Sequence, residues 1–472
     1  MVFSSISFLF WFLPGVLALY HLAPVRLRNP VLLLASLFFY TWGAGAAVLL
    51  LVVSVFADFA CGRWAHRARE AGDARGVRMA IAGSVLVNLA LLGWFKYANF
   101  VVDQLNVLGD AAGLGTIAWN SIALPIGISF FTFQSMTYTF DVARGRVAPT
   151  RSFLDFALYV ALFPQLIAGP IVRYLDIAGQ IHERERKLDD LASGALRFSH
   201  GLVKKILVAD SVGMIADAVF GAPADQLSAP LAWLGVAAYT LQIYFDFSGY
   251  SDMAIGLGRM FGFTFPENFL RPYSAASITD FWRRWHVTLS RWFRDYVYIP
   301  WGGSRGGRVA TGRNLIAVFL LCGLWHGANW TFLVWGAWHG LLLVIERATG
   351  AREQGGAVRR ALTLFLVIMG WVVFRAESIG HAGRIYAVLF SGGSGAAWPE
   401  IASALTHRNL IMLLVGVVVV LLPTSFSGAA WLESTAGARP RLARVALIAV
   451  LLPWVLVLAA AGTFSPFLYY QF

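Results

Sequence analysis

One histidine, His326, lies in the middle of a strongly apolar run bounded by Arg313 and Arg347. An imidazole can be neutral near pH 7, so it is the least costly titratable group to bury at membrane depth. Ionisable groups at that depth usually face a cavity or a helix-bundle interior and take part in function. We therefore predict that His326 is a catalytic proton acceptor. A packed histidine bonded to a backbone carbonyl fits its position equally well.

The remaining reactive side chains narrow the chemistry. The sequence has no Gly-x-Ser-x-Gly motif and no Ser-His-Asp constellation. Cys322 precedes His326 by four residues, which would place both on one face of a continuous helix and permits an acyl-cysteine intermediate. Direct attack of a hydroxyl on a thioester, with His326 taking the proton, needs fewer groups. Cys61 and Cys322 lack metal-ligand spacing, so neither a zinc site nor a structural disulfide is predicted.

Composition places the chain in a membrane. Of its 472 residues 58% are hydrophobic and 13% are charged, and the mean hydropathy is +0.66. Soluble domains carry about 25% charged residues. The apolar runs are continuous and not alternating, which favours helices over a β-barrel. The net charge of +12 therefore indicates membrane topology and contact with anionic lipid, not nucleic-acid binding.

The first part of the chain alternates apolar runs and basic loops as the positive-inside rule requires, with the N-terminus outside. The N-terminal run has no basic n-region and no small-residue cleavage site, so we expect a retained span and not a signal peptide. The expected spans are Phe3–Tyr20, Pro30–Trp42, Ala44–Gly62, Met79–Val102 and Ile117–Val142.

The next apolar run, Phe153–Val172, breaks this alternation because basic residues flank both of its ends. Pro164 and Pro170 also interrupt helical hydrogen bonding within it. We predict a broken or re-entrant element that lines a cavity, with a kinked ordinary span as the alternative. The stretch from Arg313 to Arg347 is likewise basic at both ends, which predicts a helical hairpin or two broken helices with His326 at the deepest point.

Further helices are expected along the second half of the chain. They are Leu188–Phe220, Leu231–Tyr250, Ala361–Phe374, Ile379–Phe390, Asn409–Leu422 and Val445–Ala461.

The cytoplasmic section between Arg259 and Arg313 contains a predicted amphipathic helix, Asp280–Ile299, with Asp280 as its N-cap. Such a helix would lie in the membrane interface and carry His286 one turn from Ser290. The apolar face of this helix consists of Phe281, Trp285, Leu289 and Trp292. Its basic surface could receive an anionic, pantetheine-bearing donor, or serve only as a lipid anchor.

A transporter is the main alternative to an enzyme, because transporters also have broken helices at mid-membrane. A histidine at depth suits general-base chemistry, and we expect no chain of buried carboxylates of the kind a proton-coupled carrier would use. Both observations favour an enzyme.

Five stretches in this order resemble the membrane-bound O-acyltransferase family, in particular its bacterial alginate O-acetyltransferase branch. They are LPIGISFFTFQSMTYTFDVARG (124–145), FPQLIAGPIVRY (163–174), YTLQIYFDFSGYSDMAIGLGRMFGFTFPENF (239–269), FWRRWHVTLSRWFRDYVYIPWGG (281–303) and LWHGANWTFLVWGAWHG (324–340).

The resemblance implies a single integral-membrane domain over residues 1–472, with a family core at about 124–340. The implied fold is all-α, a ring of about 11–13 transmembrane and re-entrant helices around a central funnel. It makes His326 the essential catalytic residue and His286 the second signature histidine. No bound cofactor or metal is implied.

The implied reaction takes acetyl groups from cytoplasmic acetyl-CoA across the bacterial inner membrane. A periplasmic or membrane-anchored partner acetyltransferase would then place them on an exopolysaccharide, most simply the mannuronate of alginate. Relatives of the branch act on peptidoglycan, cellulose or teichoic acid, and the shared motifs do not separate these acceptors. A non-enzymatic polymer carrier is the alternative from another class.

Overall fold

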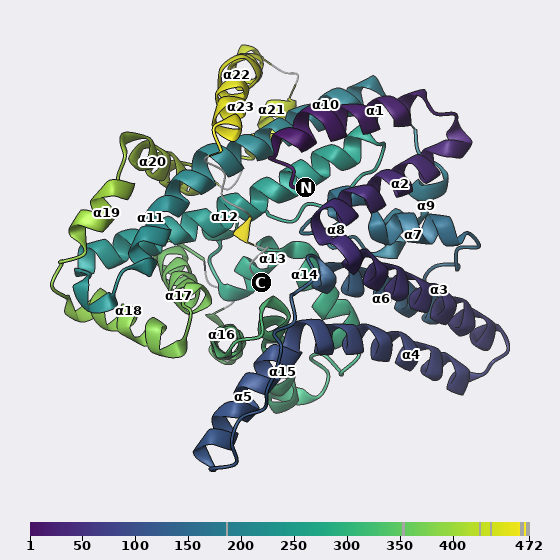
Figure 1. Ribbon diagram of the computed structural model, residues 1–472, viewed down its shortest axis with the longest axis horizontal. Helices are drawn as coiled ribbons and strands as arrows, with labels where there is room; N and C mark the ends of the chain where they lie inside the picture. The colour runs from purple at the N-terminus through teal and green to yellow at the C-terminus, as the bar shows by residue number, and fades with distance from the viewer. Residues whose placement is uncertain (186, 352–354, 424–425, 435–436, 463–466, 469–472) are drawn as a thin grey trace. The chain divides into compact units, whose positions relative to one another are not determined.

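The computed structural model describes residues 1–185, 187–351, 355–423, 426–434, 437–462 and 467–468. Within these ranges the regular structure is helical, without a strand (Figure 1). Five helical stretches are long and apolar enough to cross a membrane: Val25–Glu70, Ala74–Ala111, Gly307–His326, Ala357–Arg375 and Ala438–Ala460. The bent pair Trp398–Ala404 and His407–Leu421 is a sixth candidate. The prediction of an all-α multi-pass membrane protein is confirmed.

The chain forms two compact units. Unit 1 comprises Met1–Gly194 and Leu257–Pro266, and unit 2 comprises Ala195–Gly256 and Glu267–Phe472. The single domain, the ring of about 11–13 helices and the central funnel remain predictions.

Unit 1 is built around α3, which packs against α4 and α6. The first predicted span is shorter than expected, since its helix covers only Phe8–Leu22. The helices of unit 1 are α1 (Leu13–Leu22), α2 (Val25–Ala44), α3 (Val48–Glu70), α4 (Ala74–Leu92), α5 (Ala98–Ala111), α6 (Ile128–Ala143), α7 (Phe153–Ala161), α8 (Phe163–Leu166) and α9 (Tyr174–His182).

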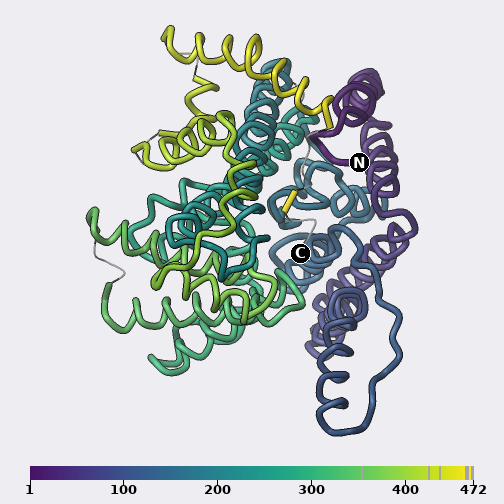
Figure 2. Tube along the Cα trace, turned by 60° about the vertical axis from the view of Figure 1, so that its left-hand side comes forward, coloured from purple at the N-terminus to yellow at the C-terminus, as the bar shows by residue number. Residues whose placement is uncertain are grey.

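The predicted span Ile117–Val142 is wrong in its first half, because helix α6 begins only at Ile128. The residues before it run back along α5 as an extended strap, drawn in dark blue in Figure 2. The side chain of Asn99 holds this strap by accepting the backbone N–H of Ile122 at 2.9 Å. Gly127, with φ of 77°, turns the chain into α6.

The break predicted within Phe153–Val172 is confirmed, while the lining of a cavity by this element stays a prediction. Helix α7 ends at Ala161, α8 is a single turn that contains Pro164, and the chain is irregular from there to Arg173. Proline removes a backbone donor and clashes with the preceding turn, which explains the interruption.

A buried polar cluster joins α3, α4 and α6. The carboxylate of Asp58, which is 0% exposed, accepts hydrogen bonds from Asn88 at 2.6 Å and from Ser135 and Thr139 at 2.7 Å each. Ser84 donates a further hydrogen bond to it. Four donors from two neighbouring helices therefore converge on one carboxylate, which links the three helices.

Unit 2 contains the predicted hairpin. Helices α15 (Gly307–His326) and α16 (Trp330–Ala348) pack along each other and are joined by Gly327–Asn329, so the hairpin is confirmed, while the depth of His326 stays a prediction. The other helices in this part of the chain are α10 (Leu188–Val203), α11 (Asp210–Gly221), α12 (Ala229–Met260), α13 (Ile278–Arg284), α14 (Val287–Phe293), α17 (Ala357–Arg375), α18 (Ile379–Ser391), α19 (Trp398–Ala404), α20 (His407–Leu421), α21 (Gly428–Glu433), α22 (Ala438–Ala446) and α23 (Leu452–Ala460).

The prediction of a continuous amphipathic helix over Asp280–Ile299 is wrong. The helix breaks between α13 and α14 at His286, whose φ of 42° and ψ of 54° are left-handed, and α14 continues into a π-helical turn, Arg294–Tyr298. Ser277, not Asp280, caps α13, since its hydroxyl accepts the Asp280 N–H at 3.1 Å. The four residues of its apolar face are each at most 4% exposed, so they pack within the protein and not in lipid.

Candidate active site

The turn between α15 and α16 positions His326. His326 is the last residue of α15, and Asn329 starts α16 by accepting the Thr331 N–H at 3.1 Å. The two helices approach closely at two glycines. A Cβ on Gly323 would lie 2.2 Å from the carbonyl oxygen of Phe332, and one on Gly336 would lie 2.3 Å from a backbone oxygen of α15. The sequence therefore fixes this turn by close backbone packing.

His326 lies in an aromatic cage. Its side chain is 3% exposed, and its ring centroid is 5.0 Å from Trp325, 5.1 Å from Trp335 and 5.2 Å from Phe374. Trp335 and Phe374 both present an edge-to-face geometry to the imidazole. The cage orients the ring and shields it from bulk water.

The backbone break in front of α14 turns His286 inward, where it is 0% exposed. The backbone on either side is paired with a neighbouring segment: the Val287 N–H donates to the Asn268 carbonyl at 3.0 Å, and the Leu270 N–H donates to the Arg284 carbonyl at 2.9 Å. These bonds replace the helical bonds that a continuous helix would have made.

The side chain of Asn268 fixes the tautomer of His286. Asn268 Oδ1 accepts the Thr288 N–H at 3.2 Å and lies 3.1 Å from His286 Nδ1. An oxygen that accepts a backbone N–H is an acceptor, so His286 Nδ1 must donate to it. In the neutral ring Nε2 then carries the lone pair. Burial lowers the pKa of His286 to about 3, so the ring stays neutral at physiological pH.

The structure brings the two predicted histidines together through one indole ring. The Trp325 centroid lies 6.0 Å from that of His286 and 5.0 Å from that of His326. Phe247 packs against the opposite side of the site, with its ring edge-on to His286 at 4.7 Å.

A third histidine, His339, was not among the predicted site residues. It is 0% exposed, and its Nδ1 accepts the indole N–H of Trp282 at 3.3 Å. Trp335 packs against both His339, at 5.0 Å, and His326, at 5.1 Å. The sequence spacing could have identified His339, since Trp335 and His339 are four residues apart and share one face of α16.

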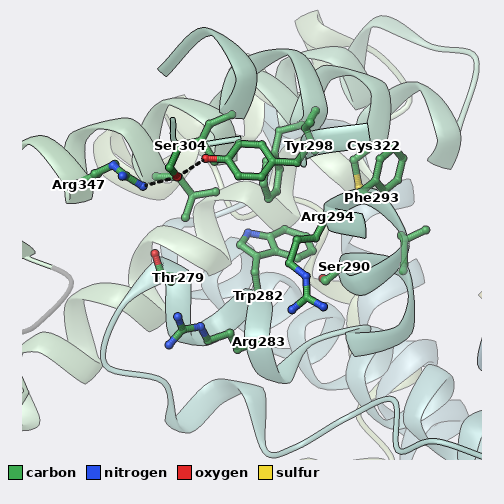
Figure 3. A pocket seen from close by; sticks show the side chains of 15 residues that line it. Thr279, Trp282, Arg283, Ser290, Phe293, Arg294, Tyr298, Ser304, Cys322 and Arg347 are labelled. Atoms are coloured by element: carbon green, nitrogen blue, oxygen red, sulfur yellow. Dashed lines mark hydrogen bonds between the residues drawn. The ribbon is translucent and has the colours of Figure 1, made fainter. Parts of the chain in front are cut away.

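A pocket of about 310 Å³ lies in unit 2 (Figure 3), and none of the three histidines is among its lining residues. Trp282 and Cys322 line it, so it reaches the residue that contacts His339 and the turn of α15 that precedes His326. Ser304 on its wall accepts a hydrogen bond from Arg347 at 3.2 Å and lies 2.9 Å from the Tyr298 hydroxyl. Its other basic side chains are Arg283 and Arg294. The pocket therefore combines an apolar wall with three guanidinium groups.

The described residues include buried carboxylates, and these are paired with cations. Asp252 is 6% exposed and forms ion pairs with Arg197 at 2.6 Å and with Lys204 at 2.9 Å. Lys205 pairs with Asp210 and Asp246, at 2.7 Å each. Each of these acids faces a cation, which is the arrangement of a structural ion-pair network. Arg197 and Asp252 lie on α10 and α12, so only the fold reveals that pairing, whereas Lys205 and Asp210 are five residues apart in the chain.

This network also supports His286. Arg197 contacts both Asp252 and Glu267, at 2.6 and 2.7 Å. Their chain neighbours, Ser251 and Asn268, are hydrogen-bonded at 3.2 Å, and Asn268 in turn holds His286. Arg197 is thus a positioning residue for the segment that orients the imidazole.

The sequence comparisons identify the family. The model of the membrane-bound O-acyltransferase family matches residues 36–372, beyond both ends of the predicted core. The chain is 44% identical to probable alginate O-acetylase AlgI of Azotobacter vinelandii over the full length of both chains. It is 47% identical to the protein of that name from Pseudomonas syringae, covering 89% of this chain and 80% of the relative.

A peptidoglycan O-acetyltransferase of Helicobacter pylori is 36% identical over 82% of this chain and 79% of its own length. The family match, the all-helical fold and the apolar helices agree with one another. The chain therefore belongs to the membrane-bound O-acyltransferase family and is a multi-pass membrane O-acyltransferase.

Proposed function

We propose that this protein transfers acetyl groups from a cytoplasmic thioester, acetyl-CoA, for the O-acetylation of an envelope polysaccharide, with alginate as the first candidate. Relatives named as alginate O-acetylases are 44–47% identical to it, against 36% for the relative named as a peptidoglycan O-acetyltransferase. That difference favours alginate, while peptidoglycan remains the second candidate. Cellulose, teichoic acid and a non-enzymatic carrier have less support.

The observation that carries the proposal is the placement of His326 at the buried end of α15, one turn after Cys322, which lines a pocket with basic side chains. In the proposed step His326 takes the proton of an acceptor hydroxyl while the hydroxyl oxygen attacks the thioester carbonyl. A C–O bond forms, the C–S bond breaks, and the proton on His326 passes to the leaving thiolate. No protein-bound acyl group is needed, so Cys322 has no covalent role in this scheme.

His286 has a different proposed role. A ring whose pKa is about 3 is a weak base at neutral pH, so it is poorly suited to hold a proton during the reaction. Its fixed tautomer directs an Nε2 lone pair away from Asn268, where it can accept a hydrogen bond from substrate. We assign it to orienting a reacting group, with His326 as the base.

The pocket is the proposed donor site. Arginine pairs with phosphate oxygens in a fork geometry, and Arg283, Arg294 and Arg347 line this pocket. Its volume of about 310 Å³ lies at the lower end of ligand cavities, which are roughly 300–1,000 Å³, so it would hold part of a coenzyme-sized donor. Its apolar wall suits the pantetheine arm.

The remaining parts of the proposal concern location and partners. We propose that the protein lies in the bacterial inner membrane, as its basic loops and apolar helices suggest. A periplasmic or membrane-anchored acetyltransferase would complete transfer to the polysaccharide, because the loops between the apolar helices are too short to hold a second catalytic domain.

The test is His326→Ala in a strain that lacks the wild-type gene. Ester-linked acetate on the polymer should fall by about 10³-fold, while the protein reaches its normal level in the membrane. His407→Ala is the matched control, since His407 is an exposed histidine of α20 in the same unit and should leave acetylation unchanged. Persistent acetylation in His326→Ala would contradict the base assignment. Acetate on peptidoglycan and not on alginate would move the proposal to the second acceptor.

A further inference from the structure

Unit 1 contains a second pocket, of about 260 Å³, that the acyl-transfer proposal does not use. Its side chains come from the end of α3 and from the loop before α7. Three of its seven lining residues are arginines, and no acid lines it. The lining residues are Arg63, His66, Arg67, Ala148, Pro149, Thr150 and Arg151. One lining residue, His66, is paired with Glu70 at 3.1 Å. The pocket is therefore suited to an anion.

The sequence places this pocket at the cytoplasmic surface. The last turn of α3 carries Arg67 and Arg69, and the loop before α7 carries Arg144, Arg146 and Arg151. Short loops enriched in arginine face the cytoplasm, where the leaflet presents anionic phosphates. Guanidinium groups bind phosphate oxygens in pairs and are more weakly hydrated than ammonium groups, so they suit this contact.

An exposed aromatic ridge continues from the pocket along α3 and α7. The guanidinium of Arg63 lies 5.4 Å from the ring centroid of Phe59, and Phe59 lies 5.4 Å from Phe153. Phe56 follows at 6.4 Å from Phe153. Phe56 is 65% exposed and Phe153 is 37% exposed. A ligand here would meet arginines at one end and bare aromatic surface at the other.

We propose that this pocket binds the phosphodiester headgroup of an anionic glycerophospholipid, with its acyl chains against Phe56, Phe59 and Phe153. The ridge is the reason to prefer a lipid over free phosphate, which would gain nothing from an apolar neighbour. The absence of an acid among the lining residues favours an anionic headgroup over a zwitterionic one, whose cation would be repelled. This lipid site is separate from the proposed acyl-transfer residues, all of which belong to unit 2.

The experiment uses the full chain in detergent, incubated with phosphatidylglycerol or phosphatidylcholine, with bound lipid counted by native mass spectrometry. The wild type should retain phosphatidylglycerol in preference to phosphatidylcholine. The double variant Arg63→Gln and Arg67→Gln should weaken phosphatidylglycerol retention about tenfold or more. The matched control is Arg75→Gln with Arg78→Gln, two exposed arginines of α4 that remove the same charge and should retain the lipid.

Single variants and competition by phosphate test the site further. Arg151→Gln changes only a loop residue, so it should weaken retention even if the α3 double variant fails to fold. Phe153→Ser should also weaken retention, and inorganic phosphate should not displace the lipid. An equal loss of phosphatidylglycerol retention in the α4 control would show non-specific charge attraction and would contradict the proposed site. Displacement by inorganic phosphate, with Phe153→Ser unaffected, would make it a free-phosphate site and overturn the lipid assignment.

Discussion

The polar cluster of unit 1 and the histidine site of unit 2 both bury titratable groups in an apolar protein, but they surround them differently. Asp58 accepts four hydrogen bonds from side chains of α4 and α6. His326 is surrounded by three aromatic rings. A carboxylate saturated with donors is held in place and has little capacity for further chemistry. For the caged imidazole of His326 we propose instead a role in proton exchange.

This contrast shows that burial alone does not identify a reactive group; the chemistry of the neighbours does. The Asp58 cluster predicts loss of the fold on mutation, whereas the histidine site predicts loss of reaction with the fold intact. Three predictions separate these outcomes, and they follow from the largest expected effect to the smallest.

Asp58→Ala should destabilise the protein most, because it leaves four buried donors without their acceptor. At about 1–3 kcal/mol for each of the four groups, we expect a loss of about 4–12 kcal/mol and a sharp fall in the amount of folded protein. Thermal unfolding of the purified protein in detergent measures this. Asp58→Asn keeps one acceptor oxygen and should lose less. An Asp58→Ala protein of normal stability but without activity would contradict this, because it would give Asp58 a role in the reaction and not in the fold.

His286→Asn should leave the fold intact and lower acetyl transfer by about 10²-fold. The asparagine amide can take the place of Nδ1 and keep the bond to Asn268, while the lone pair of Nε2 is lost. Rate measurements with the purified protein and acetyl-CoA test this. Wild-type rates would show that Nε2 has no part in the reaction and would leave His286 a packing role.

The same histidine should make the protein sensitive to acid. The pKa of His286 is about 3 in the folded protein, against 6.5 ordinarily, so the unfolded chain takes up a proton at higher pH. Its contribution to stability is complete above pH 6.5 and is lost as the pH falls from 6.5 towards 3, by up to about 1.4 kcal/mol per unit. The unfolding temperature of the wild type should therefore fall more steeply over this range than that of His286→Asn. Parallel curves would contradict the shift.

Sequence patterns were sufficient for the elements whose form is set locally. Basic residues at both ends of an apolar run predicted the α15–α16 hairpin, and Pro164 predicted the break after α7. The break at His286 could not be foreseen, because apolar residues at helical spacing favour a continuous helix. Backbone bonds to the segment around Asn268, which is distant in sequence, override that preference.

The same limit applies to the site. His326 and His286 could be singled out from an apolar run and from a family resemblance, and the structure places both against Trp325. The role of Asn268 depends on a contact between residues that no local pattern connects. The ion pairs of Asp252 depend in the same way on helices that meet only in the fold.

The most direct test of the central claim is chemical rescue of the purified His326→Ala protein by added imidazole, with acetyl-CoA as the donor. Removing the ring leaves a space within the aromatic cage that a free imidazole can occupy. If His326 is the base, imidazole should restore part of the lost rate, and a series of substituted imidazoles should give rates that vary with their pKa. A variant that keeps its wild-type rate without imidazole, or that imidazole never restores although the protein is folded, would contradict the account.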